Sequence, residues 1–156
     1  MDPGDAEEGY AGNGTPTLAR NPQEIVQTAV PFGCARPAAM PVPAHALEAD
    51  YTMHGRKVIA VRSSFSGARA AARFFTGRAR NLRACAGRAG SAAIGPLVTA
   101  VRSRSKDALS SRRTPRSDPW QELSVLDRDS VVLVAAQGGD LLTDRTMDRL
   151  IRLLHS

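Results

Sequence analysis

The stretch VLDRDSVVLVAAQGG, residues 125–139, constrains the fold of this chain more than any other part of the sequence. A charged turn comes before an apolar run, and Gly138 and Gly139 follow it. A short apolar run that is rich in β-branched residues and ends at glycine is typical of a buried β-strand. The sequence therefore predicts a strand over residues 130–136 that belongs to the core of a small domain.

A long helix is expected over residues 66–88, because Ala and Arg favour helix, although Gly77 weakens the pattern. At about 100° per residue, this segment has a basic side and an apolar side. A helix of this kind packs on a sheet, lies on a membrane surface, or binds a nucleic acid or a protein, and the plain packed helix is the commonest of these. The basic side holds Arg62, Arg69, Arg73, Arg80 and Arg83, and the apolar side holds Ala71, Phe75, Ala79, Leu82 and Ala86.

The C-terminal segment predicts a second helix, which Thr143 caps and which ends at Leu154. Asp148 and Arg152 are four residues apart, so we expect them to form an ion pair on its surface. The apolar face of this helix consists of Met147, Leu150, Ile151 and Leu154.

Three further segments complete the expected organisation. Residues 56–63 alternate in the manner of a short strand with basic ends. Residues 1–50 contain seven of the ten prolines, which indicates a disordered leader with a short turn of helix near residues 22–30. Residues 102–118 are rich in Arg and Ser and are expected to form an exposed linker.

Residues 119–126 are expected to form one or two turns of helix. Asp118 is a candidate cap, Pro119 suits the first helical position, and Gln121 completes a capping box.

Charge is divided into blocks along the chain. Residues 1–55 have a net charge of −5, residues 56–116 of +14, and residues 117–156 of −3. Such a pattern favours association with a polyanion or with an oppositely charged protein surface. A GC-rich coding bias would enrich Ala, Gly, Pro and Arg together, so part of the arginine content has an explanation that involves no function.

The sequence contains no recognisable catalytic, metal or cofactor motif. His45, His54 and His155 are scattered, and together with Cys34 they lack the spacing of zinc ligands. The glycines match neither the dinucleotide fingerprint nor a P-loop. We therefore expect a protein that is not an enzyme and that binds no cofactor or metal.

Localisation is expected to be the cytoplasm or the nucleus. Cys34 and Cys85 are too few for a disulfide-stabilised secreted domain, and the acidic first residues do not resemble a secretory signal. The longest apolar run, residues 91–101, is too short to span a bilayer.

Two parts of the chain resemble the CIDE-N domain, which occurs in the caspase-activated nuclease of apoptosis and in its inhibitor. Trp120, VLDRD (125–129) and SVVLVAAQG (130–138) are similar to the end of that domain: an aromatic residue, an acidic loop, an apolar strand and a glycine. GRKVIAVRSSFSGARAAARF (55–74) is similar to its opening strand and helix. The acidic turn of the family has no counterpart here, because residues 91–117 are basic and rich in Ser.

The resemblance implies an α+β fold, a small ubiquitin-like α/β roll over residues 51–139. A disordered leader (1–50) would precede it, a basic insertion (91–117) would interrupt it, and a C-terminal helix (140–156) would follow it. The implied function is a protein-protein interaction module that regulates apoptotic DNA fragmentation. A basic face would dock on the acidic face of another CIDE-N-like domain, in a second copy or in a different protein.

The basic face would consist of Arg56, Lys57, Arg62, Arg69 and Arg73, and the acidic face of Asp118, Glu122, Asp127 and Asp129.

Two alternatives stay open. The basic block over residues 56–116 suits non-specific nucleic-acid binding through counterion release, although few aromatic residues are available for base stacking. The other alternative is a poorly folded product of a GC-rich or truncated reading frame.

Overall fold

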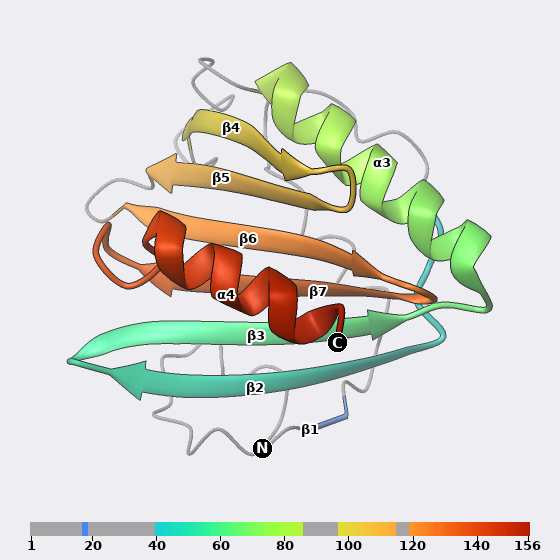
Figure 1. The fold of residues 1–156 in the computed structure, drawn as a ribbon, viewed down its shortest axis with the longest axis horizontal. Helices are drawn as coiled ribbons and strands as arrows, with labels where there is room; N and C mark the ends of the chain where they lie inside the picture. The colour runs from blue at the N-terminus through green and yellow to red at the C-terminus, as the bar shows by residue number, and fades with distance from the viewer. Residues whose placement is uncertain (1–16, 19–39, 86–96, 115–118) are drawn as a thin grey trace.

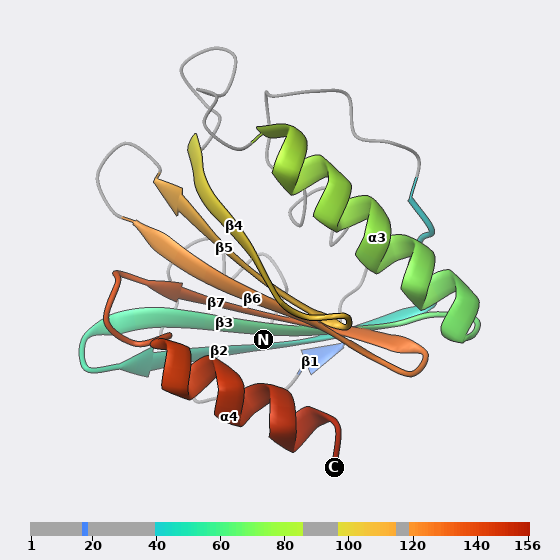
Figure 2. The ribbon, with the colours of Figure 1, turned by 45° about the horizontal axis from the view of Figure 1, so that its top comes forward.

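The computed structural model describes residues 17–18, 40–85, 97–114 and 119–156. These residues form one antiparallel sheet with the strand order β1-β2-β3-β7-β6-β5-β4 and a helix on each side of it (Figures 1 and 2). The strands are β1 (Thr17–Leu18), β2 (His45–Met53), β3 (Arg56–Ser64), β4 (Leu97–Ser105), β5 (Ala108–Thr114), β6 (Trp120–Asp127) and β7 (Ser130–Gln137), and the helices are α3 (Ala68–Cys85) and α4 (Asp144–Leu154).

The β2–β3 hairpin is closed by the two-residue turn His54–Gly55. Both residues have positive φ, 50° for His54 and 71° for Gly55. This backbone matches the right-handed twist of the two strands, and glycine adopts it without a steric cost. The turn therefore fixes the register in which Met53 faces Arg56 and His45 faces Ser64.

The two helices pack on opposite faces of the sheet, called here the α3 face and the α4 face. Phe74 of α3 packs in one cluster with Leu109 of β5, and Met147 of α4 packs in another cluster with Ala108 of β5. Ala108 and Leu109 are neighbours in the chain, but successive side chains of a strand point to opposite faces. The sheet is thus the middle of three layers, with a separate core on each side (Figure 2).

A buried ion pair joins α3 to the sheet. The Arg78 guanidinium donates a hydrogen bond of 2.7 Å to the Glu122 carboxylate and one of 2.9 Å to the Ser124 hydroxyl. The hydroxyl of Ser111 on β5 donates to the same carboxylate at 3.1 Å. Only 1% of the Arg78 side chain and 8% of the Glu122 side chain are exposed. A buried charge is tolerated in a protein only when it is paired in this way.

The ubiquitin-like roll expected from the CIDE-N resemblance is wrong, because every strand pairing in the described residues is antiparallel within a single large sheet. Residues expected to form a linker (102–118) supply β5 and the end of β4, and residues 119–126, expected to form helix, supply β6. Glu122 and Ser124 of β6 point into the polar cluster under α3. They alternate with Leu123 and Val125, which is the period of a strand, but the resemblance of Asp118, Pro119 and Gln121 to a helix start predicts the wrong element.

The ordered structure also begins earlier than expected. β2 begins at His45 and β1 lies at Thr17–Leu18, both inside the range predicted as a disordered leader. The turn of helix predicted near residues 22–30 and the end of the first predicted helix, residues 86–88, lie outside the described residues.

The other predicted elements are confirmed as β3, α3, β7 and α4. Thr143 caps α4, since its hydroxyl accepts a 3.2 Å hydrogen bond from the backbone N–H of Thr146. The predicted pairing of Asp148 with Arg152 is not what the structure shows, because the Asp148 carboxylate is bound by Arg104 of β4 at 2.7 Å. No helix among the described residues is long and apolar enough to cross a membrane.

The buried pair predicts a specific pattern of stability changes. Arg78→Met leaves the Glu122 carboxylate buried without its cation, so the free energy of unfolding should fall by about 3–5 kcal/mol. The double variant Arg78→Met/Glu122→Leu removes both charges and should recover most of that loss. Chemical denaturation of the three proteins measures both effects. A double variant as unstable as the single one would contradict this role of the pair.

Candidate functional site

The residues predicted to form one basic face lie on both sides of the sheet. Arg56 and Arg62 alternate in phase with Val58, which packs against α4, so their side chains leave β3 on the α4 face. Lys57 has the opposite phase on the same strand. Arg69 and Arg73 are exposed on α3, which covers the other face. The structure therefore does not bring these five residues together.

The residues predicted to form an acidic face are also separated. The Asp127 carboxylate accepts a 3.2 Å hydrogen bond from Arg62, so members of the two predicted faces pair with each other inside one chain. Glu122 is buried under α3, and Asp129 is exposed in the β6–β7 turn. Asp118 lies outside the described residues.

A strip of exposed apolar side chains runs along β2 on the α4 face. Leu47, Tyr51 and Met53 lie on the same side of the strand, with the buried Ala49 between Leu47 and Tyr51, and they are 43%, 36% and 48% exposed. Leu18 of β1 faces Leu47 across the strand pair and is 61% exposed. We call these four exposed residues the β2 strip. Several large apolar side chains exposed side by side are the usual mark of an interaction surface, whereas a single one needs no explanation.

Arginines lie at both ends of the β2 strip. In the register of β2 with β3, Leu47 faces Arg62 and Met53 faces Arg56 on the same side of the sheet. The two arginines are six positions apart, which corresponds to about 20 Å along a strand. The site therefore combines an apolar centre with a cation at each end.

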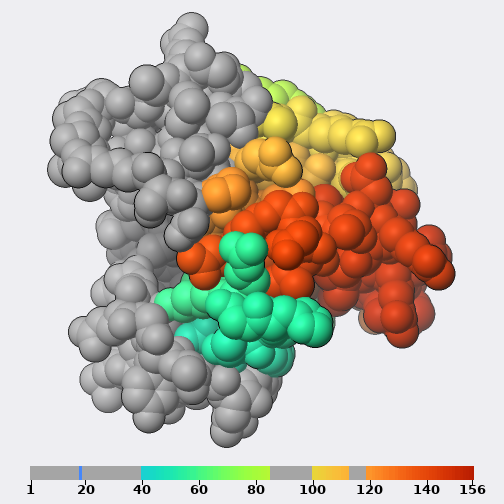
Figure 3. All heavy atoms as spheres, turned by 90° about the vertical axis from the view of Figure 1, so that its left-hand side faces the viewer, coloured from blue at the N-terminus to red at the C-terminus, as the bar shows by residue number. Residues whose placement is uncertain are grey.

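The ion pairs of the two arginines leave donor groups available. Arg56 approaches Asp140 only at 4.0 Å, and both side chains are largely exposed. Figure 3 shows the β2–β3 turn beside the segment that follows β7, where this contact lies. Arg62 uses only its Nη2 atom to contact Asp127 and Ser130. Its other N–H groups can still bind an acceptor, because a guanidinium carries five donors.

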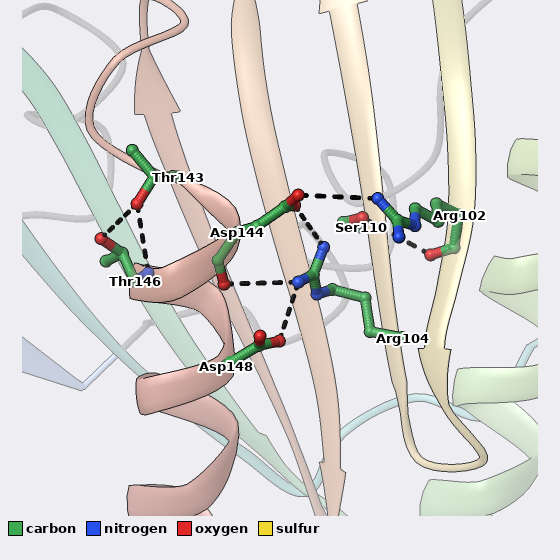
Figure 4. A network of polar contacts seen from close by, with 7 residues as sticks. All are labelled: Arg102, Arg104, Ser110, Thr143, Asp144, Thr146 and Asp148. Atoms are coloured by element: carbon green, nitrogen blue, oxygen red, sulfur yellow. Dashed lines mark hydrogen bonds and ion pairs between the residues drawn. The ribbon is translucent and has the colours of Figure 1, made fainter.

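The position of α4 explains why the β2 strip is uncovered. α4 passes in front of β6 and β7 toward β3 and leaves β2 free (Figure 1). Arg104 of β4 anchors its first turns by donating to Asp144 and to Asp148, each at 2.7 Å (Figure 4). Arg102 adds a longer contact of 3.6 Å to Asp144. The helix is thus anchored toward the β4 side of the sheet, away from β2.

The contact between Arg104 and the two carboxylates of α4 shifts the pKa values of Asp144 and Arg104. The hydrogen bond from Arg104 and then its positive charge lower the pKa of Asp144 below the ordinary value of 3.8. The hydrogen bond that Arg104 donates to Asp148 raises the pKa of Arg104, against the opposing effect of partial burial. Both groups therefore stay charged throughout the neutral range.

The strand pairings near the two sides of the sheet differ in regularity. The pairing of β4 with β5 contains two irregularities, between Val98 and Ala100 and between Ser103 and Ser105. The pairing of β2 with β3 runs without a break from His45 to Met53. Bulges and charges on an outer strand discourage association with other chains, whereas a regular apolar strand permits it. Among the described residues, β1 pairs with β2 only at Glu48 and Leu47, so this contrast points to the β2 side of the sheet as the one open to a partner.

Sequence reasoning found Arg56 and Arg62 but missed the apolar residues between them. The signal was present in the alternation of Leu47, Ala49, Tyr51 and Met53 within HALEADYTM. Ala and Glu, which favour helix and disfavour strand, and the nearby prolines concealed it.

Comparison with known proteins relates this chain to others by fold alone. No protein-family model matches it, and no curated protein matches it significantly. A solved structure, the extracellular domain of PknH from Mycobacterium tuberculosis, is similar to this chain with a TM-score of 0.56 and 14% sequence identity. The match covers 99% of this chain and 90% of that one. This likeness in fold supports the replacement of the ubiquitin-like roll by the present fold.

The anchor of α4 gives a prediction for pH. Because the pKa of Asp144 is lowered in the folded protein, its pairing with Arg104 should stabilise the fold above about pH 4 and be lost on further acidification. Carboxyl-carbon NMR should place the midpoint of Asp144 below 3.8 in the native protein and closer to 3.8 in Arg104→Gln. Equal midpoints in the two proteins would show that Arg104 does not hold this carboxylate.

Proposed function

We propose that this protein is a non-enzymatic protein-interaction domain that binds an acidic amphipathic helix over the β2 strip. The observation that carries the proposal is the apolar row of Leu47, Tyr51 and Met53 with Arg62 at one end and Arg56 at the other. Apolar and aromatic anchors supply most of the affinity of a protein interface, and charges at its rim select and orient the partner.

An acidic helix suits this surface for two reasons. A helix already covers the neighbouring part of the same face, so a second helix beside α4 would continue an existing layer. The 20 Å between the two arginines corresponds to about 13 residues of helix, which can present apolar side chains between acidic ends. Docking of an amphipathic helix on an apolar surface is a common mode of recognition.

This proposal keeps the interaction function and the basic residues Arg56 and Arg62 from the sequence prediction, and it does not depend on a ubiquitin-like roll. A partner of the CIDE-N type, a role in apoptotic DNA fragmentation and a cytoplasmic or nuclear location stay predictions. The likeness to the extracellular domain of PknH concerns the fold alone.

Defined peptides test the proposal by fluorescence anisotropy. The probe is a helical peptide of Leu and Glu. One control peptide replaces Glu by Lys, and a second replaces Leu by Ser. The protein should bind the first peptide and neither control. Tyr51→Ser should weaken binding about tenfold, which corresponds to about 1.4 kcal/mol.

Charge reversal gives the matched comparison. Arg56→Glu/Arg62→Glu should abolish binding of the acidic peptide, whereas Arg69→Glu/Arg73→Glu makes the same change of net charge on α3 and should leave binding within about twofold at moderate salt. An equal loss of peptide affinity in the two variants would show that only the net charge of the protein matters. If neither Tyr51→Ser nor Arg56→Glu/Arg62→Glu changes the affinity for the acidic peptide, the proposed site is refuted.

A further inference from the structure

A row of four arginines occupies the outer surface of α3. Arg69, Arg73, Arg80 and Arg83 are all exposed. At about 100° per residue they lie within about 80° of one another around the helix axis. At about 1.5 Å per residue the row is about 21 Å long. Thr76, also exposed, falls in the same row and fills the gap between Arg73 and Arg80.

The charges of this row are not neutralised within the described part of the chain. α3 contains no acidic residue. Arg69, Arg73 and Arg80 make no ion pair or hydrogen bond with any other described residue. Like charges one turn apart destabilise a helix by a few tenths of a kcal/mol per pair. A bound anion would relieve this repulsion.

The packing of α3 fixes the orientation of the row. Arg78 is on the same helix but is held inward by Glu122 at 2.7 Å, which prevents the helix from rotating about its axis. Arg83 is fixed at the other end of the row by a 2.7 Å hydrogen bond to the Ser103 hydroxyl of β4. The arginines therefore form a pre-arranged line on a rigid element rather than a flexible basic tail.

The hollow beside α3 is less suited to an anion than the row is. It has a volume of about 360 Å³ and lies between α3 and the β4–β5 hairpin, with Arg83 and Lys106 in its lining. Asp107 also lines it, and the carboxylate of Asp107 lies 3.8 Å from the Lys106 ammonium. The uncompensated charge is thus on the outer surface of the helix.

We propose that the α3 row binds the phosphodiester backbone of nucleic acid, without preference for sequence. Guanidinium groups bind phosphate oxygens through two parallel hydrogen bonds, and the row offers one such group or a hydroxyl on every turn of the helix. A duplex carries one phosphate charge per about 1.7 Å of its axis, so a 21 Å row lies against many of them. The row presents no aromatic side chain for stacking and no amide for reading base edges.

The same surface fits other anionic partners less well. A protein interface needs apolar anchors between its charges, and the outer surface of α3 presents none, because Phe74, Phe75 and Leu82 are buried beneath it. Stable adsorption of a helix to a membrane needs apolar side chains that enter the lipid, and on α3 these are the same buried residues. The row therefore differs in kind from the β2 strip, and the sheet separates the two.

Titration of a fluorescent duplex of about 20 base pairs at several salt concentrations tests the proposal. With four phosphate contacts, the slope of log K against log salt should be about −3 to −4. Arg69→Gln/Arg73→Gln/Arg80→Gln should reduce the magnitude of this slope by about 2–3. Duplexes rich in A·T and in G·C should bind with affinities within about threefold of each other. Thermal melting confirms that each variant is folded.

The matched control removes three exposed arginines from α4. Arg145→Gln/Arg149→Gln/Arg152→Gln changes the net charge by the same amount. The slope of log K against log salt for this variant should differ from that of the native protein by no more than about 1. Equal effects of the two triple variants would overturn the assignment to α3, and so would the absence of duplex binding at about 50 mM salt. Tighter binding to polyglutamate or to phosphatidylserine vesicles than to the duplex would overturn the choice of nucleic acid. None of these results bears on peptide binding at the β2 strip.

Discussion

The buried pair of Arg78 and Glu122 sets the arrangement on which the two proposed surfaces depend. It joins the middle of α3 to the centre of the sheet through a 2.7 Å contact in a nearly dry environment. α3 contains five arginines and no acid, and Arg78 lies on the side of the helix opposite the other four. The acceptors contributed by Glu122, Ser124 and Ser111 select Arg78 for the interior. The other arginines are thereby directed to solvent.

The antiparallel sheet then keeps the two surfaces apart. Alternation along β3 sends Arg56 and Arg62 to the α4 face, while the α3 row lies beyond the opposite face. Arg104 anchors α4 toward β4 and leaves β2 uncovered on that face. One surface combines apolar residues with two cations, and the other carries cations alone. This difference in composition is the physical reason for proposing a protein partner for one and a nucleic acid for the other.

The sequence predicted those elements whose side chains follow a simple apolar period. α3, α4, β3 and β7 each have an apolar face against the core and were found from that pattern. The resemblance of Asp118, Pro119 and Gln121 to a helix start predicts a helix where the structure has β6. The Arg and Ser content of residues 102–118 predicts a linker, but in the structure Ser111 of β5 donates to the buried Glu122 carboxylate. Composition does not distinguish a buried arginine from an exposed one. The buried pair of Arg78 and Glu122 therefore could not be predicted from the sequence.

Backbone chemical-shift mapping with both probes present is the most direct test of two separate surfaces on one domain. The acidic peptide should shift amide resonances of β2 and β3, the duplex should shift those of α3, and the shifts with both probes should be the sum of the separate ones. Formation of a complex that contains all three molecules would support the account. Overlapping shifts, or displacement of one probe by the other, would contradict it.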